Sequence, residues 1–220
     1  MINLVDQCRD LTQLNPLVRV LLQMALEDIK KQGINPLVVE TYRPIERQQY
    51  LYCQGRTIAE CVAAGINKQF ATAYCNQKAS KVTWTMNSIH IQRKAVDIVP
   101  QRIVNNKLTA IWNSQDLQTK AIIKTMEKYG FEPGANWGTN PDSPHFQIKG
   151  DFASTFSFDH TTTYITKMVQ TSLNKKIGAV LTADGAWGAK TTAAVNAFRK
   201  QQGWEENGKL GSYALTKLLE

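Results

Sequence analysis

Ser88-Ile89-His90-Ile91-Gln92-Arg93-Lys94-Ala95-Val96-Asp97-Ile98 is the stretch that decides the fold of this chain. In residues 95–99, which form its second half extended by Val99, side chains are expected to point alternately to the two faces of a β-strand. Residues 95, 97 and 99 share one face, while residues 96 and 98 share the other. We therefore expect a strand that carries the carboxylate of Asp97 and begins shortly after His90.

A second stretch, Asp142-Ser143-Pro144-His145-Phe146, completes the pattern. Residues 145–148 read as a short strand in which His145 and Gln147 point the same way. Two imidazoles and one carboxylate make a three-ligand set that leaves a fourth zinc position open, which is typical of catalytic zinc sites. The set is His90, Asp97 and His145, and it uses two of the three histidines. Asp142 could serve as a general base beside this centre.

Each of these residues also has an ordinary structural interpretation. A single histidine on a strand is more often structural than metal-binding, and Asp142 before Ser143-Pro144 is a common turn former. The spacing of His90 to Asp97, together with that of Asp142 to His145, favours the metal site over these alternatives.

The flanking segments predict helices mixed with scattered strands. Asn15-Pro16 is a typical helix start, and apolar residues recur at helical spacing until Gly33. Further helices are expected over residues 45–53 and 117–129, and a buried strand over 36–41 that leads into Tyr42-Arg43-Pro44. Residues 55–84 lack a clear pattern and could form a lid or an irregular insertion. The fold class is therefore α+β.

The tail predicts a second, all-α domain. We place the first domain at residues 1–152, a linker at 153–163 that contains His160, and the second domain at 164–220. Three helical segments are expected over 164–174, 190–202 and 212–219. The connectors 184–188 and 207–211 resemble each other, and their glycines predict two turns with positive φ and a small internal duplication. Trp187 and Phe198 are expected to anchor the small core.

Composition narrows the possible partners. The formal net charge of +8 favours polyanions, although an ordinary solvated surface is an equal alternative. No nucleic-acid recognition motif is present, and no apolar run approaches the about 20 residues that span a bilayer. The four cysteines (Cys8, Cys53, Cys61 and Cys75) form no Cys-x-x-Cys motif, so we expect free thiols. A disulfide and a cysteine metal site are less favoured alternatives.

The motifs of residues 88–98 and 142–146, with Trp137, resemble the family of zinc D,D-carboxypeptidases and L-alanyl-D-glutamate peptidases, which includes many phage endolysins. Residues 41–48 and 51–56 resemble its N-terminal signature. The resemblance implies a hedgehog/D,D-peptidase-like fold, one Zn²⁺ on His90, Asp97 and His145, and Asp142 as catalytic base. It also implies a transition-state or substrate-orienting role for Arg43. Lining the site would be Gln48, Ser88 and Trp137.

Three features depart from that family. Arg93 replaces a usual glycine, so we expect a reshaped turn between His90 and Asp97. Gly134-Ala135-Asn136 replaces a usual Gly-Gly pair, and the connection 58–82 is longer than is common. The ligand spacing itself is intact.

The tail resembles the three-helix peptidoglycan-binding domain through Val169-Gln170, Leu173-Asn174 and the run from Asp184 to Phe198. Together the two resemblances predict a peptidoglycan hydrolase of the endolysin type that cuts the L-Ala–D-Glu bond and causes lysis. A D-alanyl-D-alanine carboxypeptidase and a noncatalytic wall-binding protein are the alternatives. We expect a monomer whose partner is peptidoglycan, with neither nucleic acid nor stable membrane insertion. The N-terminus lacks a signal-peptide pattern, so we expect the protein to be cytoplasmic until the membrane is permeabilised.

Overall fold

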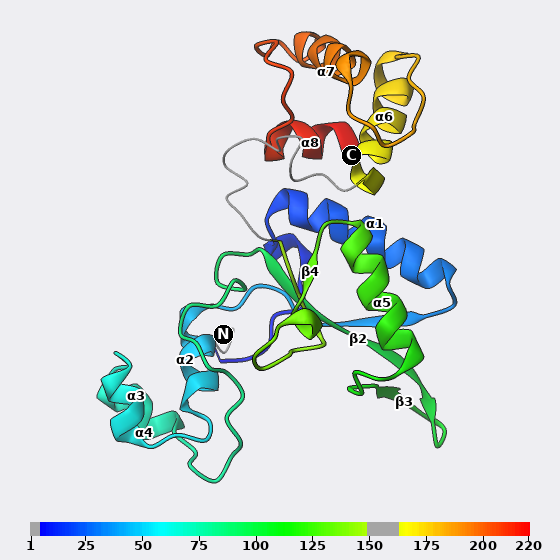
Figure 1. Ribbon diagram of the computed structural model, residues 1–220. Helices are drawn as coiled ribbons and strands as arrows, with labels where there is room; N and C mark the ends of the chain where they lie inside the picture. Colours follow the sequence, from blue (N-terminus) through cyan, green and yellow to red (C-terminus); the bar gives the residue numbers. More distant parts are fainter. Residues whose placement is uncertain (1–4, 149–162) are drawn as a thin grey trace. The chain divides into compact units, whose positions relative to one another are not determined.

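The computed structural model describes residues 5–148 and 163–220 (Figure 1). The first part contains η1 (Leu11–Gln13), α1 (Pro16–Lys31), β1 (Asn35–Glu40), α2 (Ile45–Cys53), α3 (Ile58–Ala63), α4 (Lys68–Tyr74), β2 (Ala95–Val104), β3 (Lys107–Ala110), α5 (Leu117–Lys128), β4 (Glu132–Pro133), η2 (Gly134–Asn136) and β5 (His145–Gln147). The second contains α6 (Thr163–Ile177), α7 (Ala189–Gln201) and α8 (Ser212–Leu219). These elements confirm the predicted α+β fold followed by an all-α segment. The linker expected at 153–163, with His160, falls almost entirely outside the described residues, so the domain boundaries stay a prediction.

Contacts divide the chain into two compact units. The first consists of residues 1–14 and 38–97, and the second of residues 15–37 and 98–220. The first unit contains β1's buried end, α2, α3, α4 and the turn that carries His90. The second contains α1, α5, the strands β3 to β5 and the three C-terminal helices.

One sheet organises the strands, in the order β1-β2-β5-β4, with β3 also paired to β2. The β2–β3 and β4–β5 pairs are antiparallel, with Arg102 opposite Thr109 and Pro133 opposite Phe146. Strand β2 is longer than the sequence predicted because it continues into a hairpin. Asn105 and Asn106 close that hairpin with φ of 50° and 59°, as a type I′ turn requires.

Helix α1 forms as its sequence predicts. The side chain of Asn15 accepts a hydrogen bond from the backbone N–H of Leu17, and Pro16 occupies the first turn. One face of the helix is buried, including Leu17, Leu21 and Ile29, at 0% exposure each. Gly33 then ends the segment with φ of 75°. Helix α5 begins in the same way, with Asp116 accepting from the N–H groups of its first turn.

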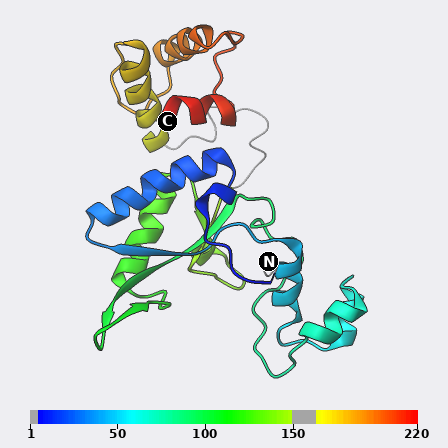
Figure 2. The same cartoon turned by 180° about the vertical axis from the view of Figure 1, so that it is seen from behind.

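The segment expected to be irregular, residues 55–84, contains two short helices instead. Thr57 and Glu60 form a reciprocal capping box that starts α3, and the side chain of Asn67 caps α4. These two helices lie beside α2, as both views show (Figures 1 and 2). The sequence missed them because helices of six and seven residues are too short to display a clear period.

In the C-terminal helices the two predicted turns are confirmed: Gly185 and Gly208 have φ of 83° and 70°. Each glycine N–H donates to a side-chain amide oxygen of a preceding helix, Gln170 in α6 and Asn196 in α7. This shared contact supports the expected internal duplication. Phe198 is buried as predicted, but Trp187 is only half-buried and donates through Nε1 to Thr192. The prediction that Trp187 is a buried core anchor is therefore wrong, because its side chain stays partly exposed.

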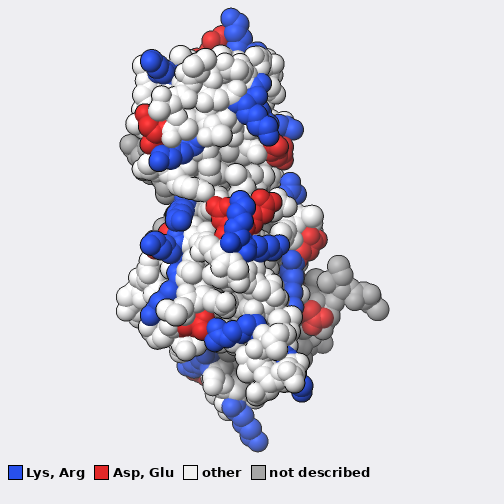
Figure 3. All heavy atoms as spheres, turned by 90° about the vertical axis from the view of Figure 1, so that its right-hand side faces the viewer, with Lys and Arg blue, Asp and Glu red and all other residues white. Residues whose placement is uncertain are grey.

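Basic and acidic side chains are interspersed on the face seen in Figure 3, which shows no single continuous basic surface there. Among the described residues, no helix is both long and apolar enough to cross a membrane.

Candidate metal centre

His90 lies in a tight turn just before β2. The N–H of His90 donates to Oγ of Ser88 at 3.4 Å, and its carbonyl accepts from the N–H of Arg43 at 3.4 Å. The imidazole is 1% exposed. The turn and the end of β1 thus fix both the backbone and the ring of this residue.

The hydrogen bonds of His90 determine which ring nitrogen carries the proton. Nδ1 lies 2.6 Å from the carbonyl oxygen of Thr41, which can only accept, so Nδ1 is the donor. Nε2 then holds the lone pair, yet it lies 3.1 Å from Oδ1 of Asp97, another acceptor. Two acceptors at this distance repel each other unless a proton or a cation binds to them. This arrangement fits a metal ligand whose second nitrogen is anchored to a carbonyl.

His145 begins β5 and is oriented by a chain of side chains. Nε2 of Gln147 donates to Glu132 at 2.9 Å, which turns the amide oxygen of Gln147 toward Nε2 of His145 at 3.1 Å. That oxygen accepts, so Nε2 of His145 carries the proton and Nδ1 holds the lone pair. The prediction that His145 and Gln147 share a face is confirmed. The ring of Trp137 lies against the imidazole, with centroids 5.0 Å apart.

The ligand atoms of His90, Asp97 and His145 all lie within 4.8 Å of one another. In a tetrahedral zinc site with bonds of about 2.0–2.2 Å, ligand atoms lie about 3.4 Å apart. The donor set, the tautomers and this spacing fit Zn²⁺, and the three residues predicted from the sequence are brought together.

A buried network of charges supports Asp97. The guanidinium of Arg43 donates to Glu40 (2.6 and 3.0 Å), to Asp97 (3.3 Å) and to the side-chain oxygen of Gln48 (3.0 Å). The second oxygen of Glu40 accepts from Arg47 at 3.1 Å. Because Glu40 is 3% exposed, the two arginines balance the two carboxylates in a place with little water.

Glu40 was missed by sequence reasoning. The signal was present, since an acidic residue ends the apolar run Leu37-Val38-Val39 at the point where the chain reaches Arg43. A carboxylate on a buried strand needs a partner, and arginines three and seven residues later supply it.

Two residues expected to line the site are buried. Gln48 is 0% exposed and donates to Thr83 and to the carbonyl of Thr85, in addition to holding Arg43. Ser88 is 7% exposed and supports the turn of His90. Both side chains therefore position other site residues in this structure.

Asp142 lies on an exposed loop, and its backbone is held on both sides. Its N–H donates to the carbonyl of Gly134 at 3.0 Å, and its own carbonyl accepts from the N–H of His145 at 3.2 Å. A Cβ at position 134 would lie 2.5 Å from that carbonyl oxygen and 3.1 Å from Cβ of His145. The glycine is thus required for the loop to pass this close. The catalytic role of Asp142 stays a prediction.

The turn between His90 and Asp97 holds Arg93 in the left-handed conformation, with φ of 62°, which glycine adopts more readily than other residues. The expected reshaping of this turn relative to the family stays a prediction. The cost of that conformation is offset by two hydrogen bonds from Arg93 to Gln13 (2.8 and 2.9 Å). The guanidinium also lies 4.0 Å from the centre of the Tyr42 ring.

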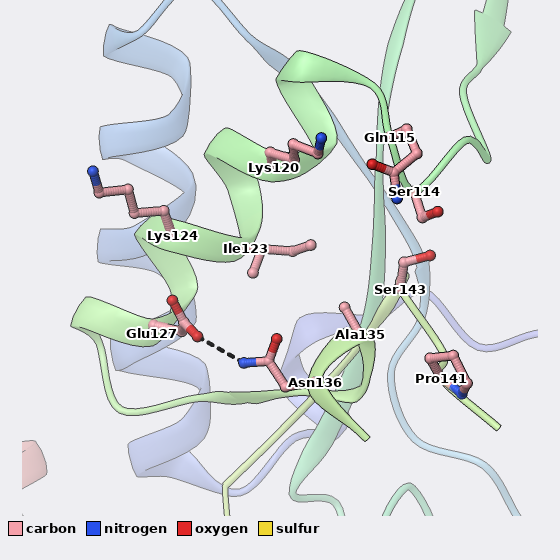
Figure 4. A pocket seen from close by; sticks show the side chains of 10 residues that line it. All are labelled: Ser114, Gln115, Lys120, Ile123, Lys124, Glu127, Ala135, Asn136, Pro141 and Ser143. Carbon is pink, nitrogen blue, oxygen red and sulfur yellow. Dashed lines mark hydrogen bonds between the residues drawn. The ribbon is translucent and has the colours of Figure 1, made fainter. Parts of the chain in front are cut away.

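A hollow with a volume of about 600 Å³ adjoins the loop that carries Asp142. Lys120 and Lys124 of α5 are among its lining residues, and in Figure 4 the ammonium group of Lys124 points away from Ser143, while Glu127 accepts from Asn136 at 2.9 Å. Ser143, the residue after Asp142, lies on the opposite wall.

Comparisons with known proteins agree with both parts of the chain. Residues 81–148 match the family described as D-alanyl-D-alanine carboxypeptidase, and residues 165–218 match the one described as "Putative peptidoglycan binding domain". Among solved structures, the chain is similar to the crystal structure of the L-Ala D-Glu endopeptidase ChiX of Serratia marcescens. The identity is 22% and the TM-score 0.39, over 66% of this chain and 89% of that chain. The family matches confirm the two resemblances inferred from the sequence.

Proposed function

Because this chain joins a segment of the D-alanyl-D-alanine carboxypeptidase family to a peptidoglycan-binding domain, we propose that it is a zinc-dependent peptidase cleaving peptidoglycan stem peptides at the L-Ala–D-Glu bond. The observation that carries the proposal is the convergence of His90, Asp97 and His145. The lone pair of His90 faces a carboxylate oxygen, an arrangement that a cation relieves.

A zinc ion held by these three residues would supply Lewis-acid polarisation of a peptide carbonyl and a lowered water pKa. The residues around it divide the remaining work. Asp142, exposed beside the last ligand, would accept the proton of the attacking water and pass it to the departing amine. Thr41 and Gln147 hold the two imidazoles in the tautomers that present a lone pair.

Arg43 would act in two ways. Its bonds to Glu40 and Asp97 keep the ligand carboxylate oriented, which supports metal affinity. Its fixed positive charge would also stabilise the negative charge that develops on the carbonyl oxygen during attack, as the sequence suggested.

The hollow beside Asp142 suits an acidic substrate. Lys120 and Lys124 line it together with Glu127, and the ammonium group of Lys120 would bind the carboxylate of D-Glu in the stem peptide. The C-terminal helices would tether the enzyme to the wall and so raise its local concentration at the bond. That pairing of a hydrolase with a binder also supports the lytic, endolysin-type role.

A D-alanyl-D-alanine carboxypeptidase is the second candidate, because the matched family carries that description. We favour the endopeptidase because a tethered binder serves an enzyme that breaks cross-linked material. The proposal is tested by incubating purified protein with cell walls and measuring new amino termini. Activity should disappear with a chelator and return with Zn²⁺. A protein that binds walls but releases no amino termini in the presence of Zn²⁺ would be a noncatalytic wall binder.

A further inference from the structure

Three cysteines converge outside the centre described above. The sulfur atoms of Cys53, Cys61 and Cys75 all lie within 4.8 Å of one another, and those of Cys61 and Cys75 are 3.3 Å apart. They come from three helices: Cys53 ends α2, Cys61 lies in α3, and Cys75 follows α4. These helices lie together in Figure 1.

The backbone holds the cysteines in register. The N–H of Asn76, the residue after Cys75, donates to the carbonyl of Cys53 at 3.3 Å. The N–H of Gly55 donates back to the carbonyl of Asn76 at 2.9 Å. Gly55 has φ of 71°, and a Cβ there would meet the backbone of Lys81 at 2.6 Å. The approach of Cys75 to Cys53 is thus built into the chain path.

The three helices are short, and the core between them is small. They contain nine, six and seven residues. An isolated helix needs about 12 residues to be even marginally stable in water, so none of the three would be stable alone. The buried core of this cluster consists of Cys53, Cys61, Ile66 and Ala71. Modules with so small a core commonly depend on a disulfide or a structural metal ion.

Burial and a nearby arginine act in opposite directions on the thiols of the cluster. Burial raises the pKa of the Cys53 and Cys61 thiols, and hydrogen bonding to Cys75 raises both further. The guanidinium of Arg56, buried and fixed to the carbonyls of Tyr52 and Thr83, opposes the rise at Cys61. Three thiolates that bind one divalent ion carry a net charge of −1, and the positive charge of Arg56 would balance it.

We propose that Cys53, Cys61 and Cys75 form a second metal site that binds one thiophilic divalent ion, Zn²⁺, through three thiolates and so holds the three helices together. Zinc–sulfur bonds of about 2.3 Å at tetrahedral angles separate two sulfurs by about 3.8 Å. The sulfurs of Cys61 and Cys75 need to move apart by only a few tenths of an ångström. Cys75 is partly exposed, which gives the ion a route and provides a fourth, solvent ligand.

Cobalt substitution of the full-length protein tests this site. Co²⁺ bound to thiolates gives an intense sulfur-to-metal charge-transfer band in the near ultraviolet, which a site of nitrogen and oxygen ligands does not. We expect the protein, purified under reducing conditions, to bind two Co²⁺ ions per chain and to show this band. His145→Ala should remove the ion at the first centre and keep the band.

Cys61→Ser should remove the band and one equivalent of metal, while Cys8→Ser, a cysteine outside the cluster, should change neither. If Cys61→Ser fails to fold, the spectrum of the unaltered protein still decides the matter. The proposal is overturned if that spectrum lacks the band, or if the reduced His145→Ala variant supplied with zinc binds no ion. A Cys61–Cys75 disulfide in protein isolated from reducing conditions, seen as a loss of two hydrogens in the intact mass, would also overturn it.

Discussion

The carbonyl oxygen of Thr41 accepts a hydrogen bond of 2.6 Å from Nδ1 of His90. This one contact joins the end of β1 to the turn before β2 and turns the lone pair of Nε2 toward Asp97. It therefore leaves Nε2 of His90 facing the carboxylate as an acceptor, which suits the proposed role of His90 as a metal ligand. The other carboxylate oxygen of Asp97 accepts from the guanidinium of Arg43, so both proposed ligands are oriented by other protein groups.

Replacing Asp142 by Asn should lower hydrolysis by about 10²–10⁴-fold, since the amide cannot accept the proton of water. Binding to walls should be unchanged, because the loop is held by backbone bonds that asparagine also makes. Amino-terminus release and wall sedimentation measure the two properties. The matched control is Asp116→Asn at the start of α5, where asparagine caps equally well and activity should persist. If Asp142→Asn retains full hydrolysis, Asp142 is not the base.

Replacing Arg43 by Lys should weaken zinc binding by about 10–100-fold although the charge is kept. Lysine cannot reach Glu40, Asp97 and Gln48 at once, as the planar guanidinium does. Competition with a chelator, read out by retained metal, measures the effect. Arg102→Lys serves as control, because its ion pair with Asp116 is exposed at the arginine. Equal zinc affinity in the two variants would show that Arg43 does not position Asp97.

Replacing Gly134 by Ala should displace the loop of Asp142, because the new Cβ would meet a backbone oxygen that cannot move alone. We expect lower activity and a loss of about 1–3 kcal/mol in the free energy of unfolding. Gly138→Ala, where a Cβ meets nothing within 4 Å, is the matched control and should be neutral. Neutral behaviour at both positions would mean that the close approach at Gly134 is relaxed at no cost.

Position 93 allows backbone strain to be separated from contacts. Arg93→Ala keeps the left-handed φ but loses the bonds to Gln13 and the stacking on Tyr42, so it should be less stable than the parent. Arg93→Gly loses the same contacts but relieves the strain, and should be more stable than Arg93→Ala by about 1–2 kcal/mol. Urea unfolding at a fixed zinc concentration measures both. Equal stability of the two variants would argue against strain at this turn.

The sequence predicted best where spacing and capping alone determine the outcome. Asn15-Pro16 and Gly33 bound α1 as expected, and the positions of His90, Asp97 and His145 were enough to expect a shared centre. Prediction from the sequence failed where contacts between residues far apart in the chain determine the structure. The helices α3 and α4 form because they pack against each other and α2, and Glu40 is buried because two arginines return to it.

The cysteines illustrate the same limit. Cys53, Cys61 and Cys75 are separated by eight and fourteen residues, which matches no compact metal motif. The bridge between Gln54 and Asn76 and the packing of α4 against α2 bring the first and last together. The tautomer of His90 was equally beyond the sequence, since it depends on a carbonyl far earlier in the chain.

Mass spectrometry of fragments released from cross-linked cell walls by the zinc-loaded protein tests the central claim most directly. The account predicts released peptides that begin with D-Glu and glycan chains that still carry L-Ala. Both products should be absent when the Asp142→Asn variant is used. Release of terminal D-Ala alone would contradict the proposed bond and identify a carboxypeptidase. Walls left intact by the zinc-loaded protein would contradict the proposed peptidase altogether.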